Sequence, residues 1–141
     1  MVPAYEHRRF NSYNVVGHTG IQFLPDVGER VYSFPEQHYK NGVKKNDDTN
    51  KAYKSIVRIF KNIRNDFVDK KLMKLENASS FFIESLVWNV PKGHFQGTTW
   101  REDAESVSLK IWSDVRNIKI ANEYAEVSDL MWLFRGQTSR M

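Results

Sequence analysis

The chain has 141 residues and a formal net charge of +4, with 40% hydrophobic and 13% aromatic residues. This composition indicates one globular domain, or part of a larger one, and excludes a disordered chain. The absence of cysteine excludes disulfides, thiolate metal ligands and cysteine nucleophiles. Neither a membrane-spanning apolar run nor a signal peptide is visible, so we expect a cytoplasmic protein with no membrane partner.

The amino-terminal third has the pattern of strands and turns. Residues 1–5 resemble the end of a strand whose beginning is missing, and the sequence turns basic just after them. The short runs 20–24 and 29–34 are separated by Pro25-Asp26-Val27-Gly28, which has the proline and glycine typical of a turn. We therefore expect a β-hairpin over residues 20–34.

A short helix should follow the hairpin. It begins at Pro35, because proline is tolerated at the first helical position, and we expect it to end at Asn41-Gly42. The polar segment 46–50 then offers an Asp or Thr as the cap of a long helix over residues 50–70. We interpret the adjacent carboxylates Asp47 and Asp48 as helix caps rather than as metal ligands.

The long helix has two different faces. Lys54, Arg58 and Lys61 lie at spacings of four and three residues, so their cations form one row. Such a row is either a solvated basic face or a surface that binds an anion, since like charges at this spacing repel mildly. The opposite face is an apolar stripe formed by Tyr53, Ile56, Val57, Phe60, Ile63 and Phe67.

The carboxyl-terminal half is predicted to be helical. Ser79 or Ser80 can cap an apolar helix over residues 81–88, which should be central in the domain. Two further helices are expected over residues 101–117 and 123–134, with a frayed end from 137 to 141. Their inward side chains are predicted to be Val107, Ile111, Trp112 and Val115 in the first, and Leu130, Met131 and Leu133 in the second.

The start of the apolar helix carries a second candidate site. Ser80 either caps the helix or helps to bind an anion at its free backbone N–H groups. Phe81 either packs in the core or stacks on a flat base. If both residues face the same cleft as the cation row, the combination suits a polyphosphate that ends in an aromatic base.

Four short motifs resemble one known family, the oligoadenylate synthetase and cGAS-like nucleotidyltransferases that include the bacterial CD-NTases. The run KSIVRIFK from Lys54 to Lys61 resembles its K-x-x-[IV]-R-x-x-K helix, and SFFIESL from Ser80 resembles S-[YF]-x-x-E-x-L. VPA at residues 2–4 resembles part of D-V-[VL]-P-A, and PEQH at 35–38 with Asn41-Gly42 resembles the bacterial P-x-Q-H-x-x-N-G. The matches occur in order over residues 1–88.

The resemblance implies an α+β, mainly helical fold, with a palm remnant over residues 1–45 and a helical domain of about four helices over 46–141. It implies donor-triphosphate contacts by Lys61, with Arg58 in the same cleft, Lys54 at its rim and Ser80 touching phosphate. Phe81 would stack on the donor base. The family's reaction is nucleotidyl transfer, and its bacterial members imply a role in antiviral defence.

One departure from the family concerns its metal site. The family uses two Mg²⁺ ions held by three carboxylates, from an upstream D-x-D and from D-V-[VL]-P-A. The sequence has neither the D-x-D nor the aspartate before Val2. The expectation is therefore no cofactor and no catalytic residue in this chain, with Mg²⁺ bound only when the missing palm residues are supplied.

Three functions from different classes remain open at this point. The chain is a carboxyl-terminal part of a nucleotidyltransferase that binds a nucleoside triphosphate weakly and is inactive alone. Alternatively, it is a binding module for nucleotide or RNA, although it lacks dense basic clustering. As a third possibility, it is a structural half that completes a separately encoded catalytic half.

Overall fold

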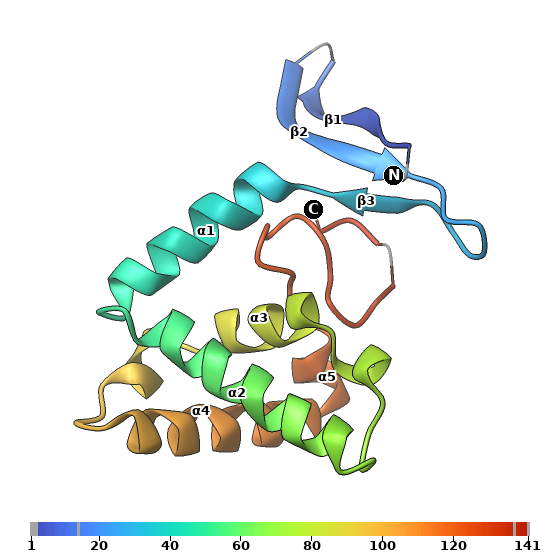
Figure 1. Ribbon diagram of the computed structural model, residues 1–141. Helices are drawn as coiled ribbons and strands as arrows, with labels where there is room; N and C mark the ends of the chain where they lie inside the picture. Colours follow the sequence, from blue (N-terminus) through green and yellow to red (C-terminus); the bar gives the residue numbers. More distant parts are fainter. Residues whose placement is uncertain (1–2, 14, 137, 141) are drawn as a thin grey trace.

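A three-stranded antiparallel sheet precedes a set of helices in this chain (Figure 1). The computed structural model describes residues 3–13, 15–136 and 138–140. The strands are β1 (Tyr5–Ser12), β2 (Val15–Phe23) and β3 (Val31–Ser33), in the order β1-β2-β3. The predicted mainly helical α+β class is confirmed.

The predicted hairpin is the β2–β3 pair. Ile21 lies opposite Ser33 and Phe23 opposite Val31, and the connecting loop contains Gly28 with a φ of 113° that suits glycine. The sequence did not reveal the longer β1–β2 hairpin, because the side chains of β1 are mostly exposed on both faces and show no apolar alternation. The strand expected at residues 1–5 was misplaced: β1 begins at Tyr5, and residues 1–2 lie outside the described part.

Helix α1 (Pro35–Asp48) begins at the predicted proline but does not end at Asn41-Gly42. The Asn41 side-chain amide donates a hydrogen bond to the Val127 carbonyl at 2.8 Å, and Gly42 is buried against the Val127 side chain. These two residues hold the carboxyl-terminal segment against the helix, so their turn-forming signal was misleading. Helix α1 therefore also crosses the expected division between residues 1–45 and 46–141, which stays a prediction.

Only three residues, 49–51, join α1 to α2 (Ala52–Asp69). Asn50 and Lys51 both have positive φ, of 52° and 70°, and this left-handed pair turns the chain sharply. The Thr49 hydroxyl accepts a hydrogen bond from the Tyr53 backbone N–H at 3.0 Å. The N-cap of α2 is Lys51, which has no side-chain cap hydrogen bond, so neither an Asp nor a Thr occupies the cap position as predicted. Asp47 pairs with the Lys51 side chain instead.

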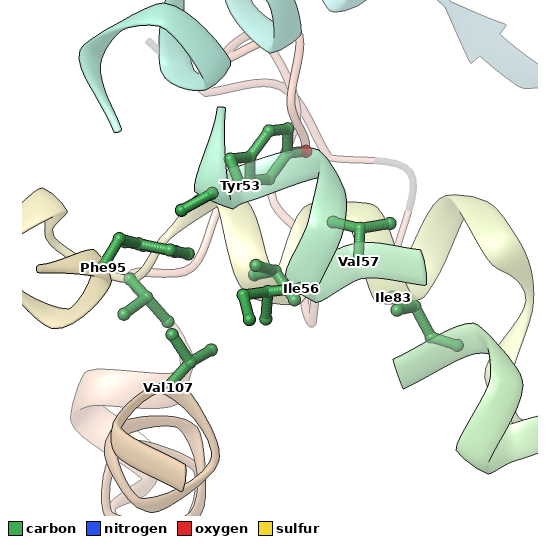
Figure 2. Close-up of a cluster of buried hydrophobic side chains, with 9 residues drawn as sticks. Tyr53, Ile56, Val57, Ile83, Phe95 and Val107 are labelled. Atoms are coloured by element: carbon green, nitrogen blue, oxygen red, sulfur yellow. The ribbon is translucent and has the colours of Figure 1, made fainter. Parts of the chain in front are cut away.

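The main core lies between α2, α3 (Ser80–Trp88) and α4 (Trp100–Val115), with the short 3-10 helix η2 (Lys92–Phe95) at one end (Figure 2). Ile56 is fully buried, and its neighbours in Figure 2 come from all four elements. The stripe on α2 is not buried along its whole length, because Ile63 is 46% exposed and Phe67 43% exposed. The labelled core residues are Tyr53, Ile56, Val57, Ile83, Phe95 and Val107.

The buried face of α4 is more polar than predicted. Val107 is fully buried and Ile111 partly so, but Trp112 and Val115 are exposed, so their predicted inward position is wrong. Asp114 is buried instead and accepts a hydrogen bond from the Tyr124 hydroxyl at 2.9 Å. A buried carboxylate that contacts the core does not register in a hydrophobic pattern.

The predicted helix over 123–134 is wrong. After the short α5 (Ile118–Ala121), the chain forms an irregular segment with isolated bridges between Ala125 and Trp132 and between Met131 and Ser139. Leu130 and Met131 are buried as expected, but they pack against Phe34 beside the sheet. The segment runs between β3 and the helices in Figure 1. A second 3-10 helix, η1 (Leu75–Ala78), connects α2 to α3.

Candidate nucleotide site

An open pocket of about 250 Å³ lies in the corner between α1 and α2. Helix α2 contributes the three predicted cations, Lys54, Arg58 and Lys61, because their spacing keeps them on one side of the helix. Helix α3 contributes Glu84. The remaining lining residues are His38, Tyr39, Gly42, Val43, Tyr53 and Val57.

Glu84 is the point where charges meet in the pocket. One of its carboxylate oxygens pairs with the Lys61 ammonium, and the other lies 3.0 Å from Nε2 of His38. The hydrogen bond from His38 is the main cause that lowers the pKa of Glu84 to about 2. The hydrogen bond from Lys61 and the charge of that ammonium add to the shift, whereas partial burial opposes it. The carboxylate is therefore ionised at neutral pH and already occupies one of the three cations.

Tyr53 fixes the floor of the pocket to α3. Its hydroxyl donates a hydrogen bond to the backbone carbonyl of Glu84 at 3.1 Å. Burial, followed by the nearby Glu84 charge, raises the pKa of Tyr53 well above its usual value. Tyr53 is thus a neutral donor that holds α2 and α3 together at the position of Glu84.

Phe81 reaches the pocket through His38. The two rings stack with centroids 5.4 Å apart and an angle of 23° between their planes. Phe81 is 43% exposed, so part of its surface is open to a ligand. The core alternative for this residue is therefore not what the structure shows.

Ser80 is not among the residues that line the pocket. Its hydroxyl accepts a hydrogen bond from Nη2 of Arg64 at 3.4 Å, and the cap of α3 is Ser79, whose hydroxyl accepts from the Phe82 N–H at 3.1 Å. Of the five predicted site residues, the structure brings three together around one pocket. It places Phe81 against His38, which lines the pocket, and leaves Ser80 hydrogen-bonded to Arg64.

Sequence reasoning missed three residues that shape this region, namely His38, Glu84 and Arg64. The first two lie within the PEQH and SFFIESL motifs, so the motifs offered a signal that was not used. Arg64 had no role in the sequence analysis. It is buried, and Nη1 donates to the Ala78 carbonyl at 2.7 Å, which ties α2 to the turn before α3.

The residues that the structure describes do not form a metal centre. No group of three or more His, Asp or Glu side chains is placed so that it could hold an ion within residues 3–13, 15–136 and 138–140. These described residues alone therefore do not supply the several oxygen ligands that the two Mg²⁺ ions implied by the resemblance would need. In the same described ranges, no helix combines the length and the apolar character needed to cross a membrane.

The chain belongs to the cGAS/DncV-like nucleotidyltransferase family. Residues 40–141 match the family described as the cGAS/DncV-like nucleotidyltransferase C-terminal helical domain. This match covers more than half of the chain and includes the whole of α2, α3 and α4.

Several bacterial synthases are similar over nearly the whole chain. A cyclic dipurine nucleotide synthase of Elizabethkingia meningoseptica is 36% identical over 140 residues, which are 99% of this chain and 47% of that protein. A cyclic GMP-AMP synthase of Staphylococcus schleiferi is 35% identical over 142 residues, with 96% of this chain and 43% of that protein covered. The chain thus spans about half the length of these relatives.

Solved structures agree with the sequence matches. The structure of the Elizabethkingia meningoseptica CdnE cyclic dinucleotide synthase with GTP and Apcpp gives a TM-score of 0.85 at 37% identity, over 99% of this chain and 50% of that one. The structure of the Rhodothermus marinus CdnE c-UMP-AMP synthase with Apcpp and Upnpp gives a TM-score of 0.75 at 28% identity, over 97% of this chain and 47% of that one.

Proposed function

We propose that this chain supplies the donor-nucleotide side of a CD-NTase active site. Lys61, Arg58 and Lys54 bind the triphosphate, and Phe81 stacks on the base. The observation that carries the proposal is the convergence of these three cations on one open pocket beside an exposed aromatic ring. Charge-assisted contacts to phosphate oxygens are stronger than neutral hydrogen bonds, which favours this ligand over an uncharged one.

The contribution of Ser80 rests on the family resemblance, because the pocket lining does not include it. Solved relatives are described with nucleotides or their analogues, which supports a nucleotide as the ligand here. The proposal also includes a role in antiviral defence, as the resemblance implies, and a cytoplasmic location, as the sequence analysis expects.

In this proposal the catalytic carboxylates come from outside the 141 residues. A two-metal site needs oxygen ligands that the described residues do not gather, and the chain spans about half the length of its relatives. We propose that a partner segment carrying the three carboxylates completes the active site against this pocket. Nucleotide binding by the present chain alone should then be weak.

Titration of ATP, followed by NMR at low ionic strength, tests the binding proposal. We expect a Kd of about 1 mM for the 141-residue chain, because the metal half of the site is missing. Added salt should weaken this binding, since the pocket is open to solvent. Shifts should cluster around Phe81 and the pocket, and Lys61→Ala should abolish them.

Lys70→Ala is the matched control. It removes the same charge from the end of the same helix, where Lys70 forms only an exposed pair with Asp66. The control should bind ATP like wild type. Shifts that spread over all basic residues and persist in Lys61→Ala would reduce the cation row to a solvated surface and refute the proposal.

A further inference from the structure

Four side chains from three helices form one continuous row of contacts. Lys61 of α2 pairs with Glu84 of α3, Glu84 accepts a hydrogen bond from His38 of α1, and the His38 ring stacks on Phe81 at the start of α3. The row begins at the cation assigned to phosphate and ends at the ring assigned to the base. Its two middle members have no role in the proposed function described so far.

The pairing of Lys61 with Glu84 creates a competition for any phosphate ligand. A triphosphate that binds Lys61 displaces the Glu84 carboxylate, whose side chain is only 30% exposed. A partly buried carboxylate that loses its cation is costly unless another donor holds it. Among the described residues, His38 is the other side chain within hydrogen-bond distance of this carboxylate.

The surroundings of His38 allow it to hold Glu84 on its own. Its side chain is 25% exposed and its ring is fixed by the stack on Phe81. Glu126, from the carboxyl-terminal segment, is close enough for its charge to interact with His38. His38 therefore interacts with two carboxyls, one of which also pairs with Lys61.

We propose that His38 is a positioning residue that couples the two ends of the nucleotide pocket. Its Nε2 retains Glu84 when the triphosphate takes over Lys61, and its ring orients Phe81 for stacking on the base. This inference depends on the proposed function, since it assigns the phosphate to Lys61 and the base to Phe81. In this proposal His38 acts through its contacts with Glu84 and Phe81.

Two substitutions separate the two contacts of His38. His38→Phe keeps an aromatic ring against Phe81 but removes the hydrogen bond to Glu84. His38→Gln removes the ring but keeps an amide N–H close to the position of Nε2. Two ligands separate the ends of the pocket, because inorganic tripolyphosphate has the phosphates of ATP without its base.

The expected result is a different pattern for each variant, measured by NMR titration at low ionic strength. His38→Phe should lower the affinity for tripolyphosphate and for ATP alike, by about two- to tenfold, which is the contribution of one hydrogen bond. His38→Gln should bind tripolyphosphate like wild type and weaken ATP by about two- to tenfold, the contribution of one aromatic pair. In the free protein, the Phe81 ring resonances should shift in His38→Gln and stay close to wild type in His38→Phe.

Each alternative outcome has a distinct meaning. If His38 has a merely structural role, both variants should bind both ligands more weakly than wild type, and that pattern overturns the inference. Wild-type binding of both ligands by both variants also overturns it, and leaves the proposed function intact if Lys61→Ala still abolishes binding. Failure of wild type to bind either ligand, or binding that survives Lys61→Ala, instead refutes the proposed function.

Discussion

Glu84 and Glu126 are both partly buried carboxyls, yet their surroundings move their pKa in opposite directions. Glu84 has hydrogen bonds from His38 and Lys61, which favour its charged form. For Glu126, burial is the main influence and raises the pKa to about 7, and only the His38 charge opposes this shift. The surroundings of Glu84 therefore favour its charged form, whereas those of Glu126 favour its neutral form.

The raised pKa of Glu126 should make the free energy of unfolding depend on pH. Its ordinary value is 4.5, so the folded state is favoured by this group below about pH 4.5 and loses that advantage as the pH rises towards 7. Glu126→Gln keeps a neutral side chain at every pH. We expect the variant to gain stability relative to wild type by up to about 3 kcal/mol between pH 4.5 and 8.

Urea unfolding at pH 4.5 and pH 8 measures this difference. Glu123→Gln is the control, because Glu123 is exposed and forms only a surface pair with Arg135. Its stability relative to wild type should barely change with pH. A Glu126→Gln variant whose advantage is equal at both pH values would contradict the assigned pKa.

The cations of the site were predictable from sequence, whereas their partners were not. Lys54, Arg58 and Lys61 lie on one helix, and helical spacing alone places them on one face. The contacts of Glu84 with Lys61 and with His38 span 23 and 46 residues along the chain. A pattern within one element carries no information about pairs at such distances, and only the motif resemblance pointed to those positions.

At the scale of elements, the accuracy of prediction followed the strength of the apolar period. Helix α2 was predicted within two residues of each end, because its stripe is regular over four turns. The segment 123–134 contains enough apolar residues for a helix, but Asp129 has a φ of 61° and the chain turns there. Its buried residues Leu130 and Met131 pack against Phe34, which lies between β3 and α1, so a tertiary contact determines its shape.

Two isoleucines on α2 test how far its stripe is buried. Ile56 is fully buried and Ile63 is 46% exposed. Ile56→Ala should lower the free energy of unfolding by about 2–5 kcal/mol, through lost burial and a cavity, whereas Ile63→Ala should cost less than about 1 kcal/mol. Chemical denaturation of both variants gives the comparison. Equal losses at the two positions would show that the outer end of α2 is covered by another surface.

At the scale of the molecule, the chain has three cations around one open pocket and no metal-binding cluster in its described residues. It matches about half the length of synthases that are similar to it over 99% and 96% of this chain. In the proposed function, binding and chemistry are therefore separate, since positioning groups do not replace the carboxylates that hold catalytic metals.

This separation predicts the outcome of an activity assay. The purified 141-residue chain, incubated with nucleoside triphosphates and Mg²⁺, should form neither an oligonucleotide nor a cyclic product, because its described residues include no cluster that could hold the catalytic metals. Chromatography of the reaction mixture provides the measurement. A product above background, lost on a substitution within this chain such as Lys61→Ala, would show that the chain is catalytically competent.

The corner between α1 and α2 has a consequence for how the protein folds. Apart from Glu84, every residue that lines the pocket lies between His38 and Lys61 in the sequence. Contacts between segments so close along the chain lose little entropy on closure, and such local contacts form quickly. We therefore expect α1 and α2 to form their side of the pocket early in folding, and α3 to add later the carboxylate that pairs with Lys61.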